Sequence, residues 1–287
     1  MAGHLMLVPT PLGNLGDLTE RAIEALRNCD RVACEDTRRT GGLLKHLGIE
    51  KPLTRFDDHA SREAFEELAL ALASNHTIAY CSDAGMPGIN DPGFEIARMA
   101  RSAGVRVTVL PGPSAVTLAI VASGLPSHAF SFHGYLPSRS EPRQTFMRAL
   151  LGREETVVVF ETPHRIHETL DELSTLAPDR EIALGRELTK LHETWYRGTP
   201  QEVTRELGKE NRGEMVLVIA GADAKRTLAE PGAEPVPGFD GETLPDWVLR
   251  YLDAAREGGM TLREAVKPLA RHLEISASEL YRLASSR

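Results

Sequence analysis

The chain has 287 residues, of which 41% are hydrophobic and 26% are charged, as is usual for a globular protein. Its formal net charge of −8 argues against a surface built throughout to bind nucleic acid, although a local basic patch is still compatible with RNA binding. No apolar run is long enough to span a membrane. The three cysteines, Cys29, Cys34 and Cys81, form no CxxC pair, so we expect reduced thiols in a cytoplasmic protein and no structural zinc.

The first part of the chain, residues 1–124, alternates predicted strands with predicted helices. The strands are expected in the short apolar runs 5–8, 30–34, 77–81 and 105–110. Repeated β-α units predict an α/β domain with a mostly parallel sheet. The polar stretch 53–60 is predicted to be a loop. The turn after the first strand has no GxGxxG motif, so the sequence gives little support to a dinucleotide-binding dehydrogenase.

The pattern changes after a Gly-Leu-Pro-Ser hinge at 124–127, because some neighbouring strands lack a helix between them. This predicts a second α/β domain at 125–221 with a mixed sheet, and a ligand cleft between the two domains. Residues 222–240 are rich in Pro, Gly, Ala and Glu and are predicted to be a linker. Residues 241–287 predict a small domain of three helices, similar to a helix-turn-helix, with seven basic and seven acidic residues. Equal numbers of basic and acidic residues are as compatible with a domain that only packs against protein as with one that makes modest contact with RNA.

The most informative stretch is 82–93, Ser-Asp-Ala-Gly-Met-Pro-Gly-Ile-Asn-Asp-Pro-Gly. It follows the predicted strand 77–81, and ligands of open α/β sheets bind at the carboxyl ends of the strands. Its three glycines allow the backbone to approach a ligand closely, and its two prolines make it stiff. We expect Asp83 to bind ribose hydroxyl groups or a cation. Asp91, directly before Pro92, fits a helix cap instead.

Other polar clusters also follow predicted strands. The run Glu35-Asp36-Thr37-Arg38-Arg39-Thr40 fits either an ordinary capped helix start or a rim that contacts phosphate, which arginine binds well. The turn Pro111-Gly112-Pro113-Ser114-Ala115 presents the free N–H groups of a helix start, to a ligand or to a capping Ser114. In the second half, charged clusters at 134–143, 160–165 and 185–193 are either solvated faces or parts of one cleft.

The 82–93 stretch matches, without a gap, the signature (S/N)DAGxPx(hydrophobic)(S/N)DPG. Further stretches match the same family in order between positions 9 and 221: PTPLGNLGDLT, EDTRRT, PGPSA, FETPHRI, RELTKLHE and GEMVLVIAG. The chain therefore resembles the tetrapyrrole-methylase-like, class III S-adenosylmethionine (SAM) methyltransferases, in the branch that methylates ribosomal RNA. The resemblance implies a homodimer with SAM folded into the cleft of each subunit, no metal, and 16S rRNA of the small ribosomal subunit as partner. The implied reaction is methylation of the ribose 2′-oxygen of cytidine 1402.

The resemblance also implies roles for individual residues. SAM contacts are expected at Pro11, Asp83, Gly85, Ile89, Ser114, Ala115, Leu188, Met215 and Val216. The candidates for positioning the 2′-hydroxyl or removing its proton are Asp36, Glu187 and Lys190, the lysine only if its pKa is depressed. The candidates for RNA phosphate contact are Arg38, Arg39, Arg139 and Arg165. The 137–143 loop departs from the lysine-rich loop of relatives, since it carries two arginines and a glutamate.

Two other functions stay open. A tetrapyrrole C-methyltransferase would use the same scaffold and also bind SAM, but the EDTRRT and RELTK stretches and the C-terminal helices favour RNA. A non-catalytic ribosome-assembly factor would bind RNA through its C-terminal helices without methyl transfer. That function leaves the two glycine-containing strand-end loops unexplained.

Overall fold

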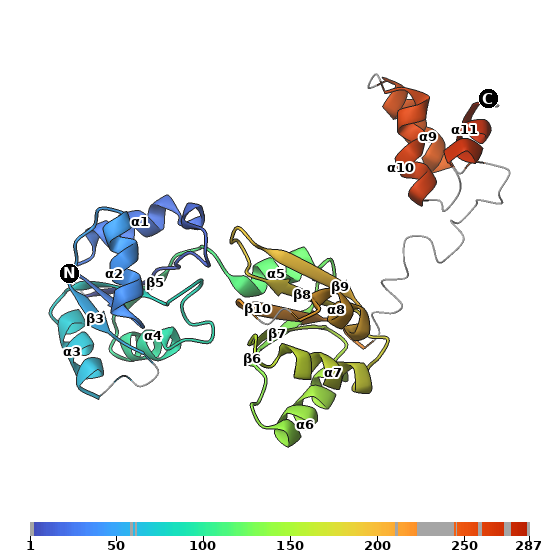
Figure 1. The fold of residues 1–287 in the computed structure, drawn as a ribbon. Helices are drawn as coiled ribbons and strands as arrows, with labels where there is room; N and C mark the ends of the chain where they lie inside the picture. Colours follow the sequence, from blue (N-terminus) through green and yellow to red (C-terminus); the bar gives the residue numbers. More distant parts are fainter. Residues whose placement is uncertain are drawn as a thin grey trace. The chain divides into compact units, whose positions relative to one another are not determined.

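The computed structural model describes residues 3–57, 60, 62–209, 212–222, 244, 246–257, 260–272 and 277–285. The chain divides into two compact units, Met1–Ala222 and Asp223–Arg287. Figure 1 colours the first from blue to orange and the second in orange-red to red. The predicted linker 222–240 lies outside the described residues except for Ala222.

The larger unit begins with a sheet of five strands in the order β3-β2-β4-β1-β5, and every pairing in it is parallel. The strands are β1 (His4–Leu7), β2 (Arg31–Cys34), β3 (Leu53–Arg55), β4 (Thr77–Cys81) and β5 (Arg106–Val109). Parallel pairing agrees with the alternation of strands and helices in the sequence. The edge strand β3 lies in the stretch predicted to be a loop, because three residues are too few to show a strand period.

Four helices cover the two faces of this sheet: α1 (Glu20–Asn28), α2 (Thr37–His46), α3 (Arg62–Ala73) and α4 (Gly93–Ser102). α1 and α2 pack with one set of strand residues and α3 and α4 with the alternate set, so the two pairs lie on opposite faces. The chain therefore leaves β1 towards one face and β4 towards the other, although these strands are neighbours. Such a switch point is where open α/β sheets bind ligands.

Local capping chemistry fixes where several helices begin. Thr19 accepts a hydrogen bond from the N–H of Ala22 at 3.2 Å and caps α1, and the carboxylate of Asp36 caps α2. Helix α8 (Pro200–Leu207) starts with a complete capping box between Thr199 and Glu202. Capping side chains satisfy N–H groups that have no partner inside the helix.

The second sheet of this unit has the order β6-β7-β10-β8-β9. Its strands are β6 (Phe130–Tyr135), β7 (Thr156–Glu161), β8 (Ile182–Arg186), β9 (Thr194–Gly198) and β10 (Met215–Ile219). Only β6 and β7 pair in parallel, so the sheet is mixed. Helices α6 (Ser140–Leu151), α7 (Ile166–Leu176) and α8 pack into one core with it. α5 (Ala115–Ser123) follows β5 in the chain yet packs against β10, β8 and β7 (Figure 1).

The smaller unit contains helices α9 (Asp246–Glu257), α10 (Leu262–His272) and α11 (Ala277–Ser285). Their buried side chains, among them Val248, Val266 and Leu280, form one apolar core. The expected fold class, α/β with a small helical C-terminal region, is confirmed. Within the described part of the chain, no helix is long and apolar enough to cross a membrane.

Candidate functional site

The loops that follow β1 and β4 are joined at the switch point of the first sheet. The backbone N–H and C=O groups of Thr10 and Gly85 exchange two hydrogen bonds of 3.0 Å, and the Thr10 hydroxyl donates to the carbonyl of Ser82 at 3.1 Å. Gly85 has a φ of +81°, and a Cβ there would lie 2.9 Å from Leu12 Cδ2. A glycine is therefore required where the two loops meet.

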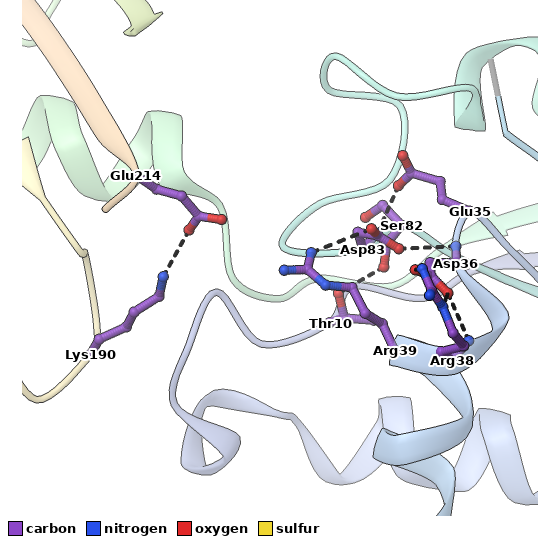
Figure 2. Close-up of polar contacts among 9 residues, drawn as sticks. All are labelled: Thr10, Glu35, Asp36, Arg38, Arg39, Ser82, Asp83, Lys190 and Glu214. Atoms are coloured by element: carbon purple, nitrogen blue, oxygen red, sulfur yellow. Dashed lines mark hydrogen bonds and ion pairs between the residues drawn. The ribbon is translucent and has the colours of Figure 1, made fainter. Parts of the chain in front are cut away.

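Asp83 stands at the centre of a polar network at this edge (Figure 2). Its backbone N–H donates to Glu35 Oε1 at 2.7 Å. Its carboxylate accepts from the backbone N–H of Asp36 at 3.1 Å and pairs with Arg39 Nη1 at 3.3 Å. The Asp83 side chain is still 30% exposed, so the carboxylate has room to accept from a ligand.

A cavity of about 240 Å³, which we call the acidic cavity, lies beside Asp83 and is lined by loops and helix starts that follow strands of the first sheet and by strands of the second sheet. Its lining contains one cation, Arg39, and four carboxylates: Glu35, Asp83, Asp91 and Glu214. The apolar part of its lining includes Leu12, Ile89, Tyr135, Phe160, Met215 and Val216. The cavity thus combines a strongly negative wall with an apolar one, which suits an organic cation.

The structure brings together most of the residues expected to contact SAM. Those that line the acidic cavity are Asp83, Ile89, Ala115, Met215 and Val216. Pro11 lines a neighbouring cavity, and Gly85 supports the loop as described above. Ser114 and Leu188 line neither: Ser114 is the N-cap residue of α5 without a side-chain cap bond, and Leu188 is buried against Gly185.

Among the lining residues after position 124, three were not selected as site candidates from the sequence: Tyr135, Phe160 and Glu214. The rings of Tyr135 and Phe160 are tilted, with centroids 5.6 Å apart. Burial, and then the negative charges of Glu214 and Glu161, raises the pKa of Tyr135. All three lie at strand ends, because β10 runs antiparallel to β7 and begins where β7 ends. Position near the carboxyl end of a strand could have identified Tyr135 and Phe160, whereas the place of Glu214 depends on the register of β10.

The side chain of Asp36 caps the start of helix α2. Its Oδ1 accepts from the backbone N–H of Arg38 at 2.8 Å, and its Oδ2 pairs with the guanidinium of Arg38 at 2.8 Å. The side-chain and backbone hydrogen bonds from Arg38 hold the pKa of Asp36 well below its usual range. A carboxylate stabilised in this way is a weak base.

Lys190 and Glu214 lie away from Asp83 in Figure 2 and form a second charged group together with Glu187. The Lys190 ammonium bonds to Glu187 Oε1 at 2.9 Å and to Glu214 Oε2 at 3.0 Å. Burial acts to lower the pKa of Lys190, but these two hydrogen bonds outweigh it and the pKa lies above its ordinary value. Burial acts to raise the pKa of Glu187, yet the bonds from Lys190 and from the N–H of Glu214 leave it lowered. Lys190 is therefore a cation in this arrangement.

The loop that carries this group is held in an uncommon conformation. Glu187 and Thr189 have φ values of +55° and +65°, which residues with a Cβ rarely adopt. The stem of Lys190 lies against the backbone of Gly13, where a Cβ would be 2.2 Å from Lys190 Cγ. The loop between β8 and β9 therefore touches the loop after β1, and Gly13 makes that contact possible.

The four arginines proposed for RNA contact lie in different surroundings. The Arg38 side chain is 90% exposed, Arg39 is paired with Asp83, and Arg139 is exposed directly before α6. Arg165 instead pairs with the buried Glu161 at 3.1 Å and donates to the carbonyl of Leu136 at 2.8 Å.

Two further charged residues from the sequence analysis, Arg143 and Asp91, hold parts of the fold together. Arg143, expected in an exposed loop, lies in α6, is 1% exposed, and pairs with Glu172 at 2.8 Å. Asp91 accepts hydrogen bonds from the N–H groups of Gly88 and Gly93 at 2.7–2.9 Å, so its carboxylate holds the loop closed. Among the described residues, no group of three or more His, Cys, Asp or Glu side chains is placed to hold a metal ion.

Comparison with known proteins identifies the family. Residues 4–204 match the family described as Tetrapyrrole (Corrin/Porphyrin) Methylases. The ribosomal RNA small subunit methyltransferase I of Synechocystis sp. is 40% identical over 284 residues, covering 98% of this chain and 97% of that protein. The protein of the same name from Bacillus subtilis is 37% identical over 280 residues, covering 97% and 93%. This chain belongs to the ribosomal RNA small subunit methyltransferase I family. It is a methyltransferase.

Solved structures share the fold at lower identity. Uroporphyrin-III-C-methyltransferase from Thermus thermophilus is 21% identical, with a TM-score of 0.56 over 78% of this chain and 97% of that one. The methyltransferase CobJ is 16% identical, with a TM-score of 0.58 over 77% and 95%. A form of the Thermus enzyme has been solved with S-adenosyl homocysteine. At these identities the likeness establishes the fold and leaves the substrate open.

Proposed function

We propose that this methyltransferase transfers the methyl group of SAM to the ribose 2′-oxygen of cytidine 1402 in 16S rRNA. The observation that carries the choice of RNA is the identity of 37–40% to relatives named for ribosomal RNA, over nearly the whole chain. The uroporphyrin-III-C-methyltransferase and CobJ structures reach only 16–21% identity, although they share the scaffold. We further propose that the enzyme acts as a cytoplasmic homodimer on the small ribosomal subunit.

The acidic cavity is the proposed SAM site. SAM carries a positive sulfonium and a positive ammonium group, which match four carboxylates against one arginine in the lining. The apolar wall that includes Phe160 and Met215 suits the adenine ring. Asp83 supplies a carboxylate for the ribose hydroxyl groups, and such a charge-assisted hydrogen bond is stronger than a neutral one. Pro11, Gly85, Ser114 and Leu188 are proposed to shape this site.

In the proposed reaction the ribose 2′-oxygen attacks the methyl carbon in line with the sulfur. The new O–C bond forms as the C–S bond breaks, the sulfonium becomes a neutral thioether, and the 2′-hydroxyl proton leaves to a base or to water. Because the donor is already activated, much of the barrier can be removed by holding the reacting atoms at roughly 3–3.5 Å in line. The protein's main task is therefore alignment.

The charged candidates take different parts in this proposal. Lys190 is proposed to position the loop between β8 and β9. Its hydrogen bonds to Glu187 and Glu214 keep the amine protonated, so it could act as a base only after both bonds are broken. Asp36 is proposed to position α2. The arginines Arg38, Arg39 and Arg139 are proposed to contact RNA phosphates, and Arg165 to do so only if it leaves Glu161.

Transfer of tritium from labelled SAM tests the function directly. The substrates to compare are small ribosomal subunits from a strain that lacks this gene, and uroporphyrinogen. We expect label in 16S rRNA of the subunits, mapped to cytidine 1402 as a 2′-O-methyl group, and none in the tetrapyrrole. Label in uroporphyrinogen would establish the tetrapyrrole reaction instead, and binding of subunits without label would establish an assembly factor.

A further inference from the structure

A second cavity, of about 290 Å³, lies on the other side of the Asp83 network. Helix α2 forms much of its wall, so we call it the α2 cavity. It shares Arg39, Ser82 and Asp83 with the acidic cavity, and these three residues therefore form a common wall. The rest of its lining comes from the loop after β1 and from the face of α2 that carries Gly42 and His46.

The two cavities differ in charge. The titratable side chains that line the α2 cavity are Arg39, His46 and a single carboxylate, that of Asp83. The acidic cavity has four carboxylates and shares the same arginine. The α2 cavity is therefore much less negative than the acidic cavity, so an anionic group fits the α2 cavity better and a cationic group the acidic cavity.

We infer that the α2 cavity receives the target nucleotide, with its ribose at the common wall and a flanking phosphate towards Arg39 and His46. This inference rests on the proposed function. Methyl transfer requires the acceptor oxygen about 3–3.5 Å from the methyl carbon, so the nucleotide pocket has to adjoin the SAM pocket. Sequence-specific recognition of folded RNA usually targets unstacked nucleotides, which can enter such a pocket.

The pair between Arg39 and Asp83 links the two cavities. It is 3.3 Å long, and the two side chains are 58% and 30% exposed, so it is a weak ion pair that is easily exchanged. A SAM ribose that takes over Asp83 releases the guanidinium of Arg39 to bind phosphate in the α2 cavity. SAM bound first therefore strengthens the binding of the RNA.

Gly42 offers a way to fill the α2 cavity without disturbing the fold. It lies within α2, it lines the α2 cavity and not the acidic cavity, and a Cβ built on it has no heavy atom within 4 Å. Replacing glycine in a helix interior also improves helix propensity. We therefore choose the series Gly42→Ala, Gly42→Leu and Gly42→Phe. The matched control is Gly152→Phe, at an exposed residue with a φ of −81° that lines neither cavity.

The experiment measures SAM affinity by calorimetry and methylation of unmodified small subunits by each variant. We expect SAM affinity to stay at the wild-type value and kcat/KM for subunits to fall with side-chain size, by about 100-fold or more for Gly42→Phe, since misplacement by 1 Å costs about that much. Gly152→Phe should match the wild type. Wild-type turnover by Gly42→Phe, or a loss of SAM affinity in it, would overturn the inference. Failure of the wild type to methylate subunits would instead refute the proposed function.

Discussion

Replacement of Asp83 by Asn tests the proposed SAM site most directly. The two side chains have the same shape, and Asn still accepts a hydrogen bond from the N–H of Asp36 through its remaining oxygen. The change removes the negative charge, and with it the pair with Arg39 and the charge-assisted bond proposed for the SAM ribose. The loop itself should persist, because the bond from the Asp83 N–H to Glu35 and the Thr10–Gly85 bridge do not involve the carboxylate.

The size of the effect follows from the loss of one hydrogen bond to a charged group. Such bonds contribute about 1.5–3 kcal/mol. Asp83 is 30% exposed, so water competes and the lower half of that range applies. At about 1.4 kcal/mol per factor of ten, we expect the Kd for SAM to rise by about 10- to 30-fold. The ion pair with Arg39 is exposed, so its loss should change the free energy of unfolding by less than about 1 kcal/mol.

Titration calorimetry with SAM, beside a urea unfolding curve for each variant, separates affinity from stability. The control is Arg39→Met, which removes the ion pair and leaves the carboxylate free. It should bind SAM as tightly as the wild type, or up to about 5-fold more tightly, because an exposed pair of at most about 1 kcal/mol no longer competes. Wild-type affinity in Asp83→Asn would show that the carboxylate does not contact SAM. An equal loss in Arg39→Met would show that the ion pair acts by supporting the loop.

The further predictions concern three other charged residues. Arg143→Ala should lower the free energy of unfolding by about 3–5 kcal/mol in urea, because Glu172 is left nearly buried without a partner. Asp91→Ala should cost about 2–3 kcal/mol, whereas Asp91→Asn should keep the two backbone bonds. Burial raises the pKa of Asp91, so the folded state holds the proton more tightly than the unfolded state. The free energy of unfolding should therefore fall as pH rises through that pKa, and Asp91→Asn should remove this pH dependence. Lys190→Ala should lose turnover on small subunits yet keep wild-type SAM affinity by calorimetry.

The sequence predicted the elements of the fold better than it predicted their packing. Strands and helices showed in the alternation of apolar runs, and the strand at 77–81 was predicted with the bounds it has in the structure. The edge strand β3 was missed, because its three residues, Leu53–Arg55, carry no period. The packing of α5 on the second sheet was also missed. Helix α5 is apolar on every side, so its sequence does not show which side is buried or against which sheet.

Strand ends were the reliable signal for the site, and strand register was the missing one. Asp83 was identified because it follows a buried strand directly. Glu214 was not, because its place beside Glu187 depends on the antiparallel pairing that sets Met215 opposite Arg186. Sequence spacing does not reveal such a pairing. Arg143 was expected at the exposed end of the 134–143 loop, where a helix was predicted to begin. Helix α6 begins earlier, at Ser140, and the sequence did not show this because Ser, Glu and Pro are common in both loops and first helical turns.

The positions of the charges explain how a protein with a net charge of −8 can act on RNA. At physiological salt, charges more than about 8 Å away are largely screened, so a bound phosphate senses its own pocket and not the whole chain. Three of the four carboxylates of the acidic cavity, all but Asp83, do not line the α2 cavity, whose wall holds Arg39 and His46. In the proposed complex, the two positive groups of SAM also offset the carboxylates nearest to the RNA. In this proposal the carboxylates of the acidic cavity face the cofactor, and Arg39 and His46 on α2 face the RNA.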